Sequence, residues 1–141
     1  MAGYSGTPLV RKLGIAAGER IAAIKPPENY ADLLRDLPED AWITNRVNAG
    51  ERFVHLFVTT RAELERRLEA LRTQIDDAGT VWVSWPKKSS GVKTDVTEDT
   101  IRAVALPLGF VDVKVCAVDE TWSGLKLMIR RANRATRARP R

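Results

Sequence analysis

Apolar residues recur along the chain in two patterns: short runs typical of buried strands, and stripes typical of amphipathic helices. The clearest run is residues 81–86, which are rich in the β-branched and aromatic residues that suit a pleated strand. Pro86 cannot donate to a strand ladder, so we expect this strand to end there. Further strands are predicted over residues 20–24, 41–44, 53–58, 111–118 and 125–129.

Helical stripes lie before and between these strands, over residues 9–15, 30–37, 60–77 and 97–108. Thr60 stands three residues before Glu63, which is the spacing of a capping box, and Thr97 can cap the last helix. Pro38 is expected to end the second helix and Gly79 the third. The chain therefore alternates strands and helices up to a final pair of strands.

This alternation predicts an α/β fold in three layers, Rossmann-like, with a mostly parallel sheet of about six strands and helices on both faces. The last two strands have a short connection, so we expect a C-terminal antiparallel β-hairpin to close the sheet. We divide the chain into an N-terminal arm (1–19), a single α/β domain (20–130) and an arginine-rich tail (131–141). In this arrangement residues 81–86 form the central strand.

The net charge of +5 belongs to the tail. Residues 130–141 hold six arginines and no acid, and without them 17 basic and 18 acidic residues remain, a net of −1. An arginine-rich, apolar-poor end is typical of a disordered extension, which is the interpretation we prefer. Because arginine pairs well with phosphate, a nucleic-acid partner bound through this tail stays open.

A single cysteine, Cys116, excludes an internal disulfide and argues against a cysteine-based metal site within one chain. We therefore expect a reducing, cytoplasmic environment. No leader-like segment opens the sequence and no apolar stretch has membrane-spanning length. Neither secretion nor membrane insertion is expected.

The order of elements over residues 20–130 resembles that of the class I methyltransferases. A strand, a helix ending in Asp77-Ala78-Gly79, a strand, a helix and a reversed final hairpin follow one another as in the closing half of that fold. The resemblance implies a site for S-adenosylmethionine at the first strand–helix turn, where a glycine-rich loop lets the cofactor approach the backbone.

That first turn reads Lys25-Pro26-Pro27-Glu28-Asn29 and holds no glycine. Proline removes a backbone donor and fixes the backbone. The acidic residue that the resemblance implies at the end of the second strand is also missing, because residues 44–46 are Thr-Asn-Arg. We therefore expect a methyltransferase-like scaffold that has lost its cofactor site, and we predict no cofactor.

Three longer segments resemble a bacterial family called domain of unknown function family 3052. They read GYSGTPLVRKLGI, VWVSWPKKSSGVKTD and VDVKVCAVDETWSGLKL, and together they are spread over nearly the whole chain. On these segments the chain is similar to that family. The resemblance implies no activity, cofactor or catalytic residue.

Ligands of open α/β sheets bind outside the carboxyl ends of the strands. Four segments of this chain are expected at that edge: residues 25–30, 59–61, 85–90 and the hairpin turn 119–123. Polar groups and aromatic rings converge there, which is the default hypothesis for a binding site. The ligand-binding candidates are Lys25, Glu28, Thr60, Trp85, Lys87, Lys88, Ser89, Asp119, Glu120, Trp122 and Ser123.

Two features of this edge have alternative interpretations. Lys87 and Lys88 can hold an anionic ligand as point charges, or lie in a solvated loop and pair with acids of the hairpin turn. Trp122 is unusual in a polar turn. It either covers the sheet edge, which we prefer, or stacks with Trp85 on a planar ligand.

Other reactive side chains indicate no chemistry by their sequence context. His55 is the only histidine and lies mid-strand among apolar neighbours, so we expect a core or sheet-edge histidine with satisfied hydrogen bonds. Cys116 is expected to be an inert core thiol. The serines have no nucleophile motif and no P-loop pattern occurs, so a serine triad is not predicted.

The preferred hypothesis is a binding module for a small anionic ligand or a protein partner, non-catalytic or cryptically active, on a degenerate methyltransferase-like scaffold. Two alternatives stay open. One is an enzyme of unknown reaction that uses the edge around Lys87, Asp119 and Glu120. The other is a nucleic-acid-associated protein that acts through its basic tail. No metal and no membrane partner are predicted.

Overall fold

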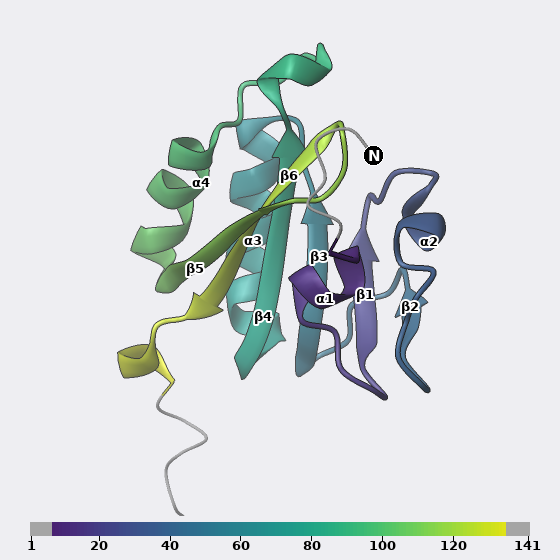
Figure 1. Cartoon of the computed structure of the whole chain (residues 1–141). Coiled ribbons are helices and arrows are strands. Elements are labelled where there is room, and N and C mark those ends of the chain that lie inside the picture. The colour runs from purple at the N-terminus through teal and green to yellow at the C-terminus, as the bar shows by residue number, and fades with distance from the viewer. Residues whose placement is uncertain (1–6, 135–141) are drawn as a thin grey trace, which may run out of the picture.

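Six strands form one twisted sheet in the order β2-β1-β3-β4-β6-β5 (Figure 1). The computed structural model describes residues 7–134, so the outer parts of the predicted arm and tail (1–6 and 135–141) lie outside the described residues. Neighbours from β2 to β4 run parallel, whereas β6 is antiparallel to both β4 and β5. The strands are β1 (Arg20–Ile24), β2 (Trp42–Thr44), β3 (Glu51–Phe57), β4 (Ile75–Pro86), β5 (Phe110–Ala117) and β6 (Trp122–Ile129).

The expected parallel sheet is thus present in four strands, and the C-terminal hairpin adds to it in antiparallel orientation. The later strand of the hairpin, β6, lies inside the sheet, and β5 forms its edge. As expected, β4 has a neighbour on each side and ends at Pro86.

Helices cover both faces of the sheet, as predicted. Helices α3 (Arg61–Gln74) and α4 (Glu98–Ala105) lie on one face, and α1 (Leu9–Leu13) and α2 (Tyr30–Leu33) lie on the other (Figure 1). Three 3₁₀ turns complete the described elements, at Lys88–Ser90, Leu106–Leu108 and Arg131–Asn133.

The period of two along β4 separates two hydrophobic cores. Val81, Val83 and Trp85 pack toward α3 and α4, whereas Trp82 packs toward α1. The indole Nε1 of Trp82 is buried and donates a hydrogen bond to the Leu13 carbonyl at 3.0 Å. This bond satisfies the one polar atom of a large buried ring, so β4 anchors both layers.

The described part of the predicted arm packs onto the sheet. Leu9, Val10, Leu13 and Ile15 are all buried in the core beneath α1. Gly14 ends α1 with φ of 76°, in the left-handed region that glycine adopts without a Cβ clash. Burying four apolar side chains stabilises this segment by several kcal/mol, at about 1.5 kcal/mol or more for each.

All four helices end earlier than the sequence predicts; α1 ends at Leu13 and α4 at Ala105. The second spans only Tyr30–Leu33 instead of residues 30–37, although Leu34 beyond it is still buried. Helix α3 ends at Gln74 instead of Asp77, because Ile75 already pairs with Glu51 as the first residue of β4. Gly79 does not stop the helix. It lies within β4, where a Cβ would approach two backbone oxygens at 3.0 Å.

The predicted caps form with one difference. The Thr60 hydroxyl accepts from the Glu63 N–H at 3.2 Å, as expected of an N-cap. The Glu63 carboxylate pairs with Arg66 and Arg67 instead of returning to the cap. Thr97 caps α4 and forms a complete box with Thr100.

Candidate functional site

The turns that follow the parallel strands lie at one edge of the sheet, as expected from the topology. Lys25 follows β1, Thr60 follows β3 and Lys87 follows β4. The Lys87 N–H donates to the Thr121 carbonyl at 2.8 Å, so the loop after β4 is joined to the hairpin turn. The structure therefore brings the predicted lysine loop and the turn before Trp122 together.

The two tryptophans of this edge do not form a pair. Trp85 packs into the core under α3 and α4, whereas Trp122 packs on the opposite face of the sheet. Trp122 instead meets the ring of Phe57 edge to face, with centroids 5.0 Å apart and planes at 90°. The alternative in which Trp85 and Trp122 stack on one ligand is therefore wrong, because Trp122 pairs with Pro86 and neighbouring positions in a strand point to opposite faces.

Asp119 is used by the hairpin turn itself. Its buried carboxylate accepts hydrogen bonds from the N–H groups of Thr121 and Trp122, each at 2.8 Å. Such a bond from a side chain to nearby backbone is an Asx turn, and it fixes the loop in which it lies. Glu120 next to it is exposed, and Ser123 continues the ladder opposite Trp85.

Lysines at the edge carry uncompensated charge. None of the ion pairs found among residues 7–134 includes Lys25, Lys87 or Lys88. The alternative in which Lys87 and Lys88 pair with acids of the hairpin turn is therefore not observed among these residues. Ser89 and Glu28, two other predicted site residues, are exposed. Within residues 7–134 this edge thus presents three lysines that form no ion pair.

The first strand–helix turn has unusual backbone geometry. Lys25 has φ of 55°, in the left-handed region that is unfavourable for residues with a Cβ. Pro26 and Pro27 follow, so two consecutive positions offer no N–H. A turn that approaches a cofactor through backbone amides needs those donors, and these residues do not fit S-adenosylmethionine in that way.

The connection from β2 to β3 borders a groove beside β1, on the face of the sheet that carries α3. These parallel strands flank β1, and only residues 45–50 join them, without the helix that such crossovers usually contain. The loop is held by hydrogen bonds from Arg20 to the Arg46 carbonyl and from Gln74 to the Val47 carbonyl. On the face of the sheet that carries α3, one part of β1 is therefore bordered by this loop instead of a helix.

We call this cavity the β1 groove, and its volume is about 510 Å³. Its apolar wall includes buried Ile24 and Leu71. Lys25 and Arg67 bring positive charge to it, but Arg67 is held by Glu63 at 3.0 Å. The groove is lined by Ala23, Ile24, Lys25, Pro26, Asn45, Val47, Arg67, Ala70, Leu71 and Gln74. Of the predicted site residues, only Lys25 lines it.

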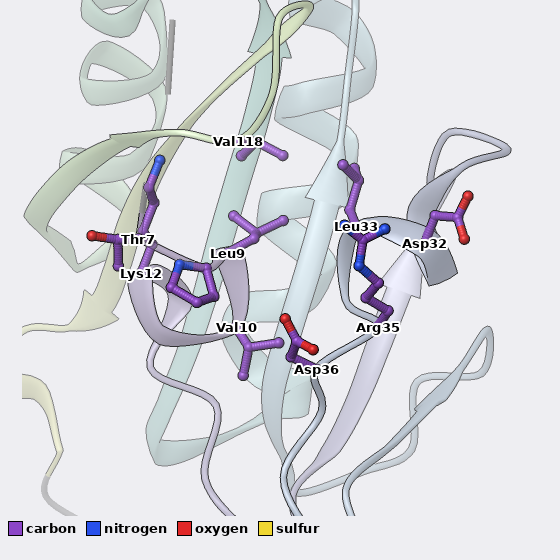
Figure 2. A pocket seen from close by; sticks show the side chains of 10 residues that line it. Thr7, Leu9, Val10, Lys12, Asp32, Leu33, Arg35, Asp36 and Val118 are labelled. Carbon is purple, nitrogen blue, oxygen red and sulfur yellow. The ribbon is translucent and has the colours of Figure 1, made fainter. Parts of the chain in front are cut away.

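A second cavity, of about 290 Å³, lies between α1 and α2 on the other face. Figure 2 shows apolar side chains of Leu9 and Val10 on one side of it and Arg35 and Asp36 on the other. Arg35 and Asp36 are both exposed, and their opposite charges balance at the rim. This cavity has an apolar floor but no excess charge to select a ligand by sign.

A buried chain of polar side chains was not foreseen. The hydroxyl of Tyr30 lies 2.7 Å from His55 Nδ1, and His55 Nε2 lies 2.8 Å from Ser84 Oγ. His55 and Ser84 are completely buried, and Tyr30 is 3% exposed. His55 also stacks on Phe57, with ring centroids 4.2 Å apart. The prediction of a core histidine with satisfied hydrogen bonds is therefore confirmed.

Burial controls the ionisation of this chain. It lowers the pKa of His55 to about 3, so the imidazole is neutral at physiological pH, and it raises the pKa of Tyr30 above its ordinary value. Ser84 has no access to solvent, so it cannot meet a substrate as a nucleophile in this conformation. The chain is a structural network that joins α2, β3 and β4.

Cys116 is half-buried on β5. Burial raises the pKa of its thiol, although the positive charges of Lys12 and Lys114 act in the opposite direction. This fits the expected inert thiol. Across the part of the chain that the structure describes, no three His, Cys, Asp or Glu side chains gather as a metal site, and no helix has the length and apolarity to span a membrane.

Comparisons with solved structures agree with the topology. A S-adenosylmethionine-dependent methyltransferase from Aquifex aeolicus superposes with a TM-score of 0.64 at 12% identity, over 86% of this chain and 87% of that one. One from Clostridium acetobutylicum gives a TM-score of 0.54 at 5% identity, over 86% and 87% of the chains. The fold is methyltransferase-like. Identities this low show the fold alone.

No family model and no curated protein matches the chain. Similarity to domain of unknown function family 3052 therefore stays a prediction. The methyltransferase-like scaffold itself was correctly predicted from the order of elements.

Proposed function

We propose that this protein is a small-ligand binding module on a methyltransferase-like scaffold, which takes an anionic molecule into the β1 groove and does not use S-adenosylmethionine. The observation that carries the proposal is the turn at the end of β1. There a lysine with left-handed backbone and no ion-pair partner among residues 7–134 lies beside two prolines and lines the groove.

The backbone of Lys25 supports a binding role. A non-glycine residue in the left-handed region costs about 1 kcal/mol or more, and such costs persist where the surroundings or a function require them. A lysine occupies this position, where glycine would be unstrained. A positive charge at the mouth of the groove is a function that glycine would not provide.

The β1 groove combines polar and apolar surface, which suits a small ligand that carries an anionic group on a partly apolar body. Ile24, Val47 and Leu71 offer apolar surface, while Asn45 and Gln74 offer amide groups. Polar atoms make up more of the lining surface of the groove than apolar atoms, so the polar and anionic groups of a ligand find most of their partners here. Of the two cations, Lys25 is the one without an ion-pair partner among residues 7–134, so its charge is available to an anion.

A fluorescence titration with anilinonaphthalene sulfonate tests the proposal, because this probe joins an apolar ring system to one anionic group. Ala70 is an exposed residue of α3 that lines the groove, and Ala70→Trp fills part of its volume. We expect the affinity for the probe to fall by about tenfold or more, equivalent to about 1.4 kcal/mol. Lys25→Gln is expected to weaken binding by a smaller factor.

The matched control is Ala62→Trp, the same substitution at an exposed position of the same helix that does not line the groove. It is expected to bind the probe as the wild type does. Equal loss in both tryptophan variants, or unchanged binding in Ala70→Trp and Lys25→Gln, contradicts binding in the β1 groove.

A further inference from the structure

None of the helices within residues 7–134 covers the second face of the C-terminal hairpin. On the face toward α3 and α4, Leu125, Leu127 and Ile129 of β6 are completely buried. The alternate residues of β6 point the other way, where α1 and α2 cover the other strands (Figure 1). We call this surface the hairpin face; it consists of Val111, Lys114, Cys116, Lys126 and Met128, of which Cys116 is half-buried against the core beneath α1.

Register places two lysines of this face directly opposite each other. Lys114 on β5 pairs with Lys126 on β6, just beyond the irregularity between Asp112 and Lys114. Side chains directly opposite in an antiparallel pair have Cβ atoms about 5 Å apart, and like charges there are destabilising. The hairpin therefore holds an unfavourable pair of charges on an accessible surface.

A third lysine extends the positive charge toward α1. Lys12 reaches from α1 toward the hairpin, and its Nζ donates to the Ala117 carbonyl at 3.0 Å (Figure 2). Cys116 lies close enough to Lys12 and Lys114 for both to affect its pKa. Lys12 and Lys114 thus both bring positive charge to the end of the face that holds Cys116.

The two lysines that face each other across the hairpin have no acidic partner among residues 7–134. The nearest acid along β5, Asp112, points to the opposite face and binds Arg102 at 2.9 Å. From Thr121 to the end of the sequence the chain has no acid but has Lys126 and six arginines.

We propose that the hairpin face binds the phosphate backbone of a nucleic acid. Positive charge on the face continues in sequence into Arg130 and Arg131, both exposed, and then into the tail. A long run of basic residues without acids is complementary to an extended polyanion more than to a compact ligand. This inference is independent of the proposed small-ligand site, which lies between β1 and α3.

Recognition at this face is independent of base sequence. Its side chains are two lysines, a valine, a cysteine and a methionine, so no aromatic ring is present to stack on bases. Lysine contacts to phosphate position a strand but carry no sequence information. We therefore expect binding that depends strongly on salt and little on sequence.

Fluorescence anisotropy with labelled DNA tests the proposal on the full chain. The probes are a single strand and a duplex of about 20 residues, each in two unrelated sequences. The double variant Lys114→Gln/Lys126→Gln is expected to weaken binding about tenfold and to lower the slope of log affinity against log salt by about two. Its melting temperature is expected to match or exceed that of the wild type, because the like charges are removed.

The matched control is Arg46→Gln/Lys93→Gln, which removes two exposed positive charges away from the hairpin face. It is expected to bind DNA with the wild-type affinity and to change the slope of log affinity against log salt by less than about one. If the lysine double variant does not fold, Lys126→Gln alone replaces it, with half the expected change in slope.

Four results overturn the proposal. The first is the absence of DNA binding at low salt, and the second is an equal loss of affinity in the hairpin and control variants. The third is a hairpin variant that binds DNA as the wild type does, while the triple variant Arg137→Gln/Arg139→Gln/Arg141→Gln loses binding. The fourth is binding of polyglutamate as tight as that of DNA, which assigns the face to an acidic protein.

Discussion

The imidazole Nε2 of His55 lies 2.8 Å from the hydroxyl oxygen of Ser84, and both side chains are completely buried. The other ring nitrogen, Nδ1, is hydrogen-bonded to the hydroxyl of Tyr30, so both nitrogen atoms of the imidazole have hydrogen-bond partners inside the core. A satisfied neutral histidine is stable in such a place, whereas a charged one is not.

The native protein is therefore expected to keep His55 neutral well below pH 6. Because it is the only histidine, its ring proton signals in an NMR titration are unambiguous. With its pKa lowered by burial to about 3, we expect no titration between about pH 8 and pH 4. A midpoint near the ordinary histidine value of about 6.5 contradicts the buried arrangement.

The same burial makes stability depend on pH. In the unfolded chain His55 takes up a proton near its ordinary pKa of about 6.5, whereas in the folded chain it does so only near 3. Between these values the unfolded state binds more protons, so the free energy of unfolding falls as pH decreases, by about 1.4 kcal/mol per pH unit from this group. Urea unfolding of the wild type and of His55→Gln at several pH values measures this effect. The difference between their free energies of unfolding should shrink toward low pH. Parallel curves of unfolding free energy against pH contradict the buried, neutral histidine.

Removing one end of the buried chain should destabilise the fold. Ser84→Ala leaves His55 Nε2 without a partner, and we expect a loss of about 1–3 kcal/mol in the free energy of unfolding. Ser89→Ala, at an exposed position, is the matched control and should change stability by no more than about 0.5 kcal/mol. Chemical denaturation of both variants measures this, and equal stabilities contradict a structural role for the chain.

Much of the fold follows from local patterns. The strand over residues 81–86 and its end at Pro86 were predictable because periodicity and proline act within the segment itself. The end of α3 was not, because Ile75 leaves the helix in order to pair with Glu51, which is distant in sequence. Pairing between strands overrides local helical preference there.

The candidate site was less predictable than the fold. The position of Lys25 at the sheet edge follows from the order of elements, but its left-handed backbone and the β1 groove do not. The Tyr30–His55–Ser84 chain and the separation of Trp85 from Trp122 depend on register between strands. A one-residue change in register would reverse every side chain, so sequence spacing alone does not fix these contacts.

Replacing Lys25 should separate its stability cost from its function. Lys25→Gly places glycine at φ of 55°, and we expect a gain of about 0.5–1 kcal/mol in the free energy of unfolding. The same variant should lose affinity for anilinonaphthalene sulfonate, because the free cation of the groove is gone. Denaturation and fluorescence titration are run on one sample. A variant that is less stable and binds the probe as tightly as the wild type contradicts both roles.

The central claim is that a methyltransferase-like scaffold here serves a ligand other than S-adenosylmethionine. Isothermal titration calorimetry of S-adenosylmethionine into the full chain tests it most directly, on protein whose probe binding has already shown a folded β1 groove. We predict no heat of binding at ligand concentrations up to about 1 mM. A saturable heat with a dissociation constant of about 100 μM or tighter would contradict the account.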